Sequence, residues 1–146
     1  FKRPACSDFL KFCLERFDVA VWSSRSKTTY CIYHIAAAVI CPSAVLIIIM
    51  CSVFPWEKGD YDESNTLLLD DSPYKALLNP PHTAIFPFTY NFKDGEADDL
   101  IGPGGSLRAY LEELAKAENA QDYIRSHPFG QEAITEQNLY WPFYQK

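Results

Sequence analysis

The sequence predicts an α/β domain in which a parallel sheet is flanked by helices and carries one apolar helical insert. Segments with helical periodicity alternate with short, uninterrupted apolar runs along the chain. Such runs lack the polar–apolar alternation of a half-exposed strand, which is typical of a parallel sheet covered on both faces. The length of 146 residues suits one domain.

Residues 1–27 supply the first helix and the first strand. Pro4 to Arg16 carries apolar side chains at helical spacing, and Pro is tolerated in a first turn. Asp18 to Trp22 is a buried strand in this interpretation, and it ends in a polar turn that contains Ser23 and Ser24.

Residues 28–56 form the apolar insert, which contains no Lys, Arg, Asp or Glu. Cys31 to Phe54 is long enough to span a bilayer as a single-pass transmembrane helix, for which about 20 apolar residues are needed. Three interpretations stay open: a membrane span, a buried core helix, or translated non-coding sequence from a mispredicted or alternatively spliced transcript. A span would place the strands before and after it on opposite sides of a membrane and deprive them of hydrogen-bond partners.

Residues 57–146 return to the composition of a globular domain. The predicted elements are two strands, a helical turn between them and two helices. They cover Thr66–Asp70, Thr83–Phe86, Tyr74–Leu78, Ser106–Lys116 and Ala120–Ser126. The aromatic-rich tail from Phe129 to Lys146 is expected to pack back onto the domain.

Charge and cysteine content narrow the class of protein. The net charge of −6, without any Lys/Arg-rich block, argues against binding to the nucleic-acid backbone. The five cysteines include no C-x-x-C pair, so we expect reduced, buried thiols in an intracellular protein. Because the chain starts at Phe1 without a signal peptide, we expect its start to be a cut end.

Two strand ends carry the candidate chemistry. Ser23 and Ser24 follow one apolar run, and Asp70 and Asp71 end another. Ligands of open parallel sheets bind at the carboxyl ends of the strands. Mg²⁺ takes one or two carboxylates together with water and phosphate oxygens, and a Ser hydroxyl can donate to a phosphoryl oxygen. The same residues also suit ordinary turns.

A family resemblance favours a phosphate and Mg²⁺ site over ordinary turns at these strand ends. The chain contains R-P-x-x-x-x-F-L, then V-x-V-W-S-S, then L-L-L-D-D-S-P-Y-K, with NPPHTAIFPF and HPFGQEAITEQNLYWPFY after them. This order resembles the RNA polymerase II C-terminal-domain phosphatases and NLI-interacting-factor-like phosphatases of the haloacid dehalogenase superfamily, in a plant-type branch. The resemblance implies a fragment of a haloacid-dehalogenase-like (Rossmannoid) fold whose first strand is missing.

The resemblance also implies roles for the motifs of this hydrolase family. In the family, a D-x-D-x-T/V loop supplies the nucleophilic Asp and a general acid/base; we find no such motif here. Ser23, with Ser24 beside it, would bind phosphate, and Asp70 and Asp71 would hold Mg²⁺. The family's catalytic Lys is expected within the insert; Lys27 and Lys58 are the nearest lysines, but neither matches in context. We therefore expect no phosphatase activity from this chain and weak Mg²⁺ binding at most.

The expected function is thus a fragment of a Mg²⁺-dependent phosphoserine/phosphothreonine phosphatase-like domain with a phosphoprotein partner. The alternative is a binding module of the same fold, as in the presequence receptor of the mitochondrial inner-membrane protein-import translocase. The corresponding locations are the nucleus or cytoplasm, or the mitochondrial inner membrane. A fragment that does not fold stably is the third possibility.

Overall fold

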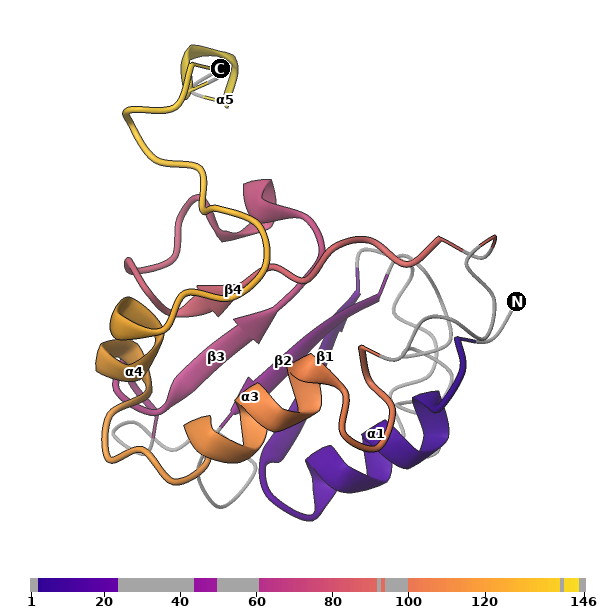
Figure 1. Ribbon diagram of the computed structural model, residues 1–146. Helices are drawn as coiled ribbons and strands as arrows, with labels where there is room; N and C mark the ends of the chain where they lie inside the picture. Colours follow the sequence, from indigo (N-terminus) through magenta and orange to yellow (C-terminus); the bar gives the residue numbers. More distant parts are fainter. Residues whose placement is uncertain are drawn as a thin grey trace.

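A computed structural model describes residues 3–23, 44–49, 61–91, 93, 100–139 and 141–144. It contains four strands and five helical segments in mixed order (Figure 1). In chain order they are α1 (Cys6–Leu14), β1 (Asp18–Ser23), β2 (Ala44–Ile49), β3 (Thr66–Leu69), η1 (Pro73–Ala76), β4 (Ala84–Ile85), α3 (Ser106–Leu114), α4 (Ala120–Ser126) and α5 (Trp141–Tyr144). The predicted α/β class is confirmed at this level, and most predicted elements lie within two residues of the observed bounds.

The four strands form one sheet in the order β1-β2-β3-β4. β2 is antiparallel to both of its neighbours, whereas β3 and β4 are parallel. β1, β3 and β4 therefore point the same way, and β2 runs against them. The prediction of a parallel sheet was correct for these three strands and wrong for the sheet as a whole.

β2 lies inside the segment that we expected to be helical. Ala44–Ile49 has the sequence AVLIII, and its β-branched residues favour a strand. The expected apolar helix is therefore wrong over these six residues, and the rest of the insert lies outside the described ranges. Among the residues that are described, no helix has the length and apolar character needed to cross a membrane.

The main core lies between the sheet and the helices α1, α3 and α4, which occupy one side of it in Figure 1. Leu67 and Leu69 of β3 point into this core, because alternate strand residues share a face. Leu111 and Leu114 of α3 meet them there, and both are fully buried. Helical cover is thus seen on one face of the sheet within the described part of the chain, where the sequence predicted it on both.

Phe12 of α1 connects the first helix to α3. Its ring is buried, and the guanidinium groups of Arg16 and Arg108 lie 4.2 and 4.6 Å from its centroid. Arg16 also pairs with Glu112 of α3 at 3.2 Å, and Arg108 pairs with Asp8 of α1 at 2.5 Å. Two ion pairs thus connect α1 and the residues that follow it to α3.

The C-terminal tail joins the sheet edge at two residues. Gly130 forms a parallel bridge with Phe86, and the Gln131 amide donates to the Phe86 carbonyl at 2.6 Å. Beyond this contact the tail leaves the domain, and Leu139 and Phe143 are 93% and 74% exposed (Figure 1). The expectation that the whole tail packs back onto the domain was therefore wrong after Gln131.

The contact between the tail and the sheet edge depends on a glycine at position 130. Its φ is +77°, and an added Cβ would lie 2.1 Å from the Phe86 carbonyl oxygen. Gly104 has a similar φ of +80°, but nothing lies within 4 Å of its virtual Cβ. A comparison of Gly130 with Gly104 therefore separates the effect of backbone strain from that of steric collision.

We predict that Gly104→Ala costs about 1 kcal/mol of unfolding free energy, and that Gly130→Ala costs about 3 kcal/mol or more. The second substitution adds a collision with backbone atoms, which must move and break the bridge to Phe86. Urea denaturation of both variants measures the difference. Equal losses would show that the close approach to Phe86 contributes nothing.

Candidate functional site

The two predicted strand ends lie at the same edge of the sheet. Leu46 of β2 pairs with Val21 on one side and with Leu69 on the other. Two residues further on, β1 reaches Ser23 and the chain after β3 reaches Asp71, so both arrive at the same level. With β2 between them, their backbones are separated by two strand spacings, about 10 Å. The structure thus brings Ser23 and Asp71 to one edge, whereas Ser24 lies outside the described residues.

Asp70 follows β3 directly, and its carboxylate is enclosed. Its side chain is 2% exposed, and the Lys75 ammonium donates to its two oxygens at 3.1 and 2.9 Å. The Ser72 backbone amide donates to Oδ1 at 2.8 Å. Asp70 is therefore occupied by contacts within its own turn.

Lys75 was absent from our candidate residues. It lies in η1, and the turn at Ser72-Pro73 brings its ammonium back over the end of β3. The spacing of five residues between an Asp at a strand end and a Lys after Pro was the available signal. Lys27 and Lys58, the two lysines weighed as catalytic candidates, lie outside the described residues.

Asp71 is held through its side chain and its backbone carbonyl, and it is partly open to solvent. The Ser72 hydroxyl donates to its Oδ1 at 3.0 Å. The Gln131 side-chain amide donates to the carbonyl oxygens of Asp71 and Pro87, at 2.9 Å each. Gln131 therefore fixes the peptide that carries the more accessible of the two carboxylates.

Burial is the main influence on the ionisation of Asp70. It raises the pKa of this carboxyl above its ordinary value, and the nearby negative charge of Asp71 adds to the rise. The hydrogen bonds and the positive charge of Lys75, with the Ser72 amide, act in the opposite direction. The Lys75 ammonium therefore stabilises the charged form of the Asp70 carboxylate at this buried position.

The side chains at this edge fit a Mg²⁺ ion poorly. Asp70 is engaged by Lys75, which leaves Asp71 as the carboxylate that could contribute an oxygen. Within the described ranges, no three His, Cys, Asp or Glu side chains are grouped closely enough to hold a metal ion. Of the two expected metal ligands, Asp70 is thus paired with Lys75, and Asp71 is the more accessible.

A literal D-x-D triplet occurs at Asp60-Tyr61-Asp62, without the Thr or Val of the family motif. Asp62 precedes β3 and so lies at the opposite end of this strand from Asp70. Its carboxylate accepts bonds from the Ser64 amide and hydroxyl at 2.8 and 2.6 Å, and these bonds lower the pKa of Asp62. Asp62 therefore closes the turn before β3, away from the candidate edge.

The cysteines and histidines among the described residues differ in their burial. Cys6 and Cys13 are buried and form no disulfide, as expected, and burial raises the pKa of Cys13 to about 12. The remaining three cysteines lie outside the described residues. His82 and His127 are exposed.

We predict that Lys75→Met lowers the unfolding free energy by about 1.5–3 kcal/mol at neutral pH, because it leaves the buried Asp70 carboxylate without its cation. The loss should shrink as the pH falls through the raised pKa of Asp70, because the carboxyl then becomes neutral. Below about 3.9, its unfolded value, it is protonated in both states. Urea denaturation at neutral and acidic pH measures both effects.

Lys116→Met is the matched control for this experiment. Lys116 pairs with Glu113 at 2.6 Å, but both side chains are more than 60% exposed. A surface pair of this kind contributes less than about 1 kcal/mol. A loss at Lys75 that is no larger than at Lys116, or that does not change with pH, would contradict the role assigned to the Asp70–Lys75 pair.

The candidate site is therefore an edge formed by the carboxyl ends of β1 and β3, with a locked Asp70–Lys75 pair and a more open Asp71 beside it. Comparison with known proteins found no matching family model, no matching curated protein and no matching solved structure.

Proposed function

We propose that this chain is part of a phosphoprotein phosphatase-like domain of the haloacid dehalogenase type, and that the chain by itself does not hydrolyse phosphate esters. The supporting observation is the shared level of Ser23 and Asp71 at the carboxyl edge of two strands that point the same way. Ligands of sheets with parallel strands bind at such edges. Asp71, the more accessible carboxylate there, could contribute one oxygen to a cation that accompanies a phosphoryl group.

We propose the absence of catalysis because of the side chains that lie at this edge. An aspartyl-phosphate route needs a carboxylate that attacks phosphorus and a second group that transfers the proton. Asp70 is buried and paired with Lys75, so it is not placed to attack. Asp62, the described carboxylate of the D-x-D triplet, lies at the other end of β3. Asp71 alone cannot supply both groups.

The alternative function is a non-catalytic binding module of the same fold for a polypeptide such as a presequence. The pairing of Asp70 with Lys75 favours this alternative, because it commits a potential metal ligand to the turn itself. The two functions differ in whether phosphate or metal contributes to binding. A module that binds polypeptide alone needs neither.

We predict weak binding of Mn²⁺, used as a paramagnetic probe for Mg²⁺, with a dissociation constant in the millimolar range. Asp71→Asn should abolish this binding, because Asp71 is the accessible carboxylate at the edge. Asp62→Asn, at the opposite end of β3, is the matched control and should leave it unchanged. Electron paramagnetic resonance titration measures the bound fraction. Binding that survives Asp71→Asn would place the metal elsewhere.

We also predict no Mg²⁺-dependent release of phosphate from p-nitrophenyl phosphate or a phosphoserine peptide above the uncatalysed rate. The physical reason is the missing pair of an attacking carboxylate and a proton-transferring group. Steady-state assays with and without Mg²⁺ measure the turnover. Metal-dependent turnover that disappears in Asp71→Asn would refute the inactivity of the chain and support an intact phosphatase.

A further inference from the structure

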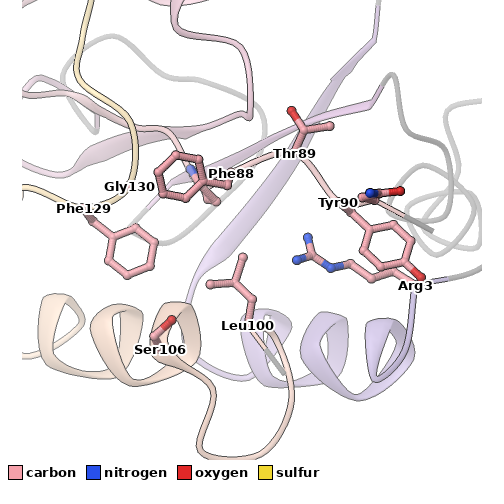
Figure 2. A pocket seen from close by; sticks show the side chains of 10 residues that line it. Arg3, Phe88, Thr89, Tyr90, Leu100, Ser106, Phe129 and Gly130 are labelled. Atoms are coloured by element: carbon pink, nitrogen blue, oxygen red, sulfur yellow. The ribbon is translucent and has the colours of Figure 1, made fainter. Parts of the chain in front are cut away.

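An open pocket of about 600 Å³ lies beside the point where the tail joins the sheet. Figure 2 shows the rings of Phe88, Tyr90 and Phe129 around it, with Leu100 at its floor and Arg3 at one end. Its volume falls within the range of about 300–1,000 Å³ that is common for ligand pockets. Phe88 is 70% exposed, so an apolar ring at the pocket mouth is left in water.

The guanidinium of Arg3 contributes the positive charge of this pocket. It lies over the ring of Tyr90, with its central carbon 5.1 Å from the ring centroid. Among the residues that the structure describes, the others that line the pocket are uncharged: Pro87, Phe88, Thr89, Tyr90, Asn91, Leu100, Ser106, Phe129 and Gly130. The pocket therefore suits an apolar or aromatic segment that also carries negative charge.

The tail of the same chain, from Phe129 to Lys146, has this chemistry. It contains Glu132 and Glu136, and its one basic residue is the terminal Lys146. Its apolar side chains are exposed, with Leu139 at 93% and Phe143 at 74%. Transfer of such apolar groups from water into an apolar pocket is favourable.

We propose that the tail of one copy docks into the pocket of a second copy, so that two chains exchange their tails. The tail begins at Gly130, which itself lines the pocket, and Gln131 fixes this start through its bonds to Phe86, Asp71 and Pro87. From there the tail leads away from the sheet to α5 (Figure 1). Entry into a neighbour's pocket needs no reversal of this direction.

Hydrogen bonds within the tail shape its local turns. The Asn138 amide donates to the Thr135 carbonyl at 2.9 Å, and the Thr135 hydroxyl donates to the Gln137 side chain at 2.8 Å. The Trp141 amide then donates to the Asn138 carbonyl at 2.9 Å, which starts α5. Reciprocal exchange of such a segment produces a closed two-fold dimer, in which each chain gives one tail and accepts one.

Sedimentation equilibrium of the full chain, from low micromolar to near-millimolar concentration, tests the proposal. The expected result is a concentration-dependent dimer. Phe143→Ser in the tail and Phe88→Ser in the pocket should each raise its dissociation constant by about tenfold or more, because each removes an aromatic anchor. Both side chains are mainly exposed, so the fold should be retained, which circular dichroism checks.

Leu78→Ser is the matched control, because Leu78 is 98% exposed but belongs to neither the tail nor the pocket. It should leave the dimer unchanged. An equal mixture of the Phe143→Ser and Phe88→Ser chains should associate more tightly than either alone, because the mixed dimer keeps one intact tail and one intact pocket. A chain that stays monomeric, a dimer that survives Phe88→Ser, or an equal effect of Leu78→Ser would overturn the proposal.

Discussion

The contact between Gly130-Gln131 and the end of β4 is the constraint on which the C-terminal half of this structure depends. A single glycine without a Cβ lets two backbone segments meet at a distance that other residues cannot reach. Through the Gln131 side chain the same contact reaches Asp71, so a segment sixty residues away in sequence holds a strand end. The edge of the sheet, the pocket wall and the direction of the tail are all set at this one place.

Burial gives the two adjacent carboxylates at the end of β3 different roles. Asp70 is turned inward and neutralised by Lys75, so its charge stabilises the turn rather than serving a ligand. Asp71 stays more open, with its backbone clamped by Gln131. A buried charge is commonly paired with an opposite charge, because an unpaired buried charge is strongly destabilising. The acidic pair is therefore unequal, although the sequence shows two identical residues.

Most elements could be predicted from periodicity, and the misses have physical causes. The helix Ala120–Ser126 was predicted at its observed bounds, since Asn119 caps it and its apolar residues keep helical spacing. The strand Ala44–Ile49 was missed because a long apolar run does not distinguish a buried strand from a helix. Lys75 was missed because a turn, rather than a pattern, brings it to Asp70. The contacts of Gln131 are long-range, and a single sequence contains no signal for them.

The position of β2 has a consequence for how the sheet can accommodate an added strand. A single antiparallel strand between β1 and β3 leaves those two strands pointing the same way. Direct parallel pairing of β1 with β3 would preserve the same directions, so a segment such as Ala44–Ile49 can be gained or lost between them without reversing either half. The carboxyl ends of β1 and β3 would face the same side with or without β2 between them.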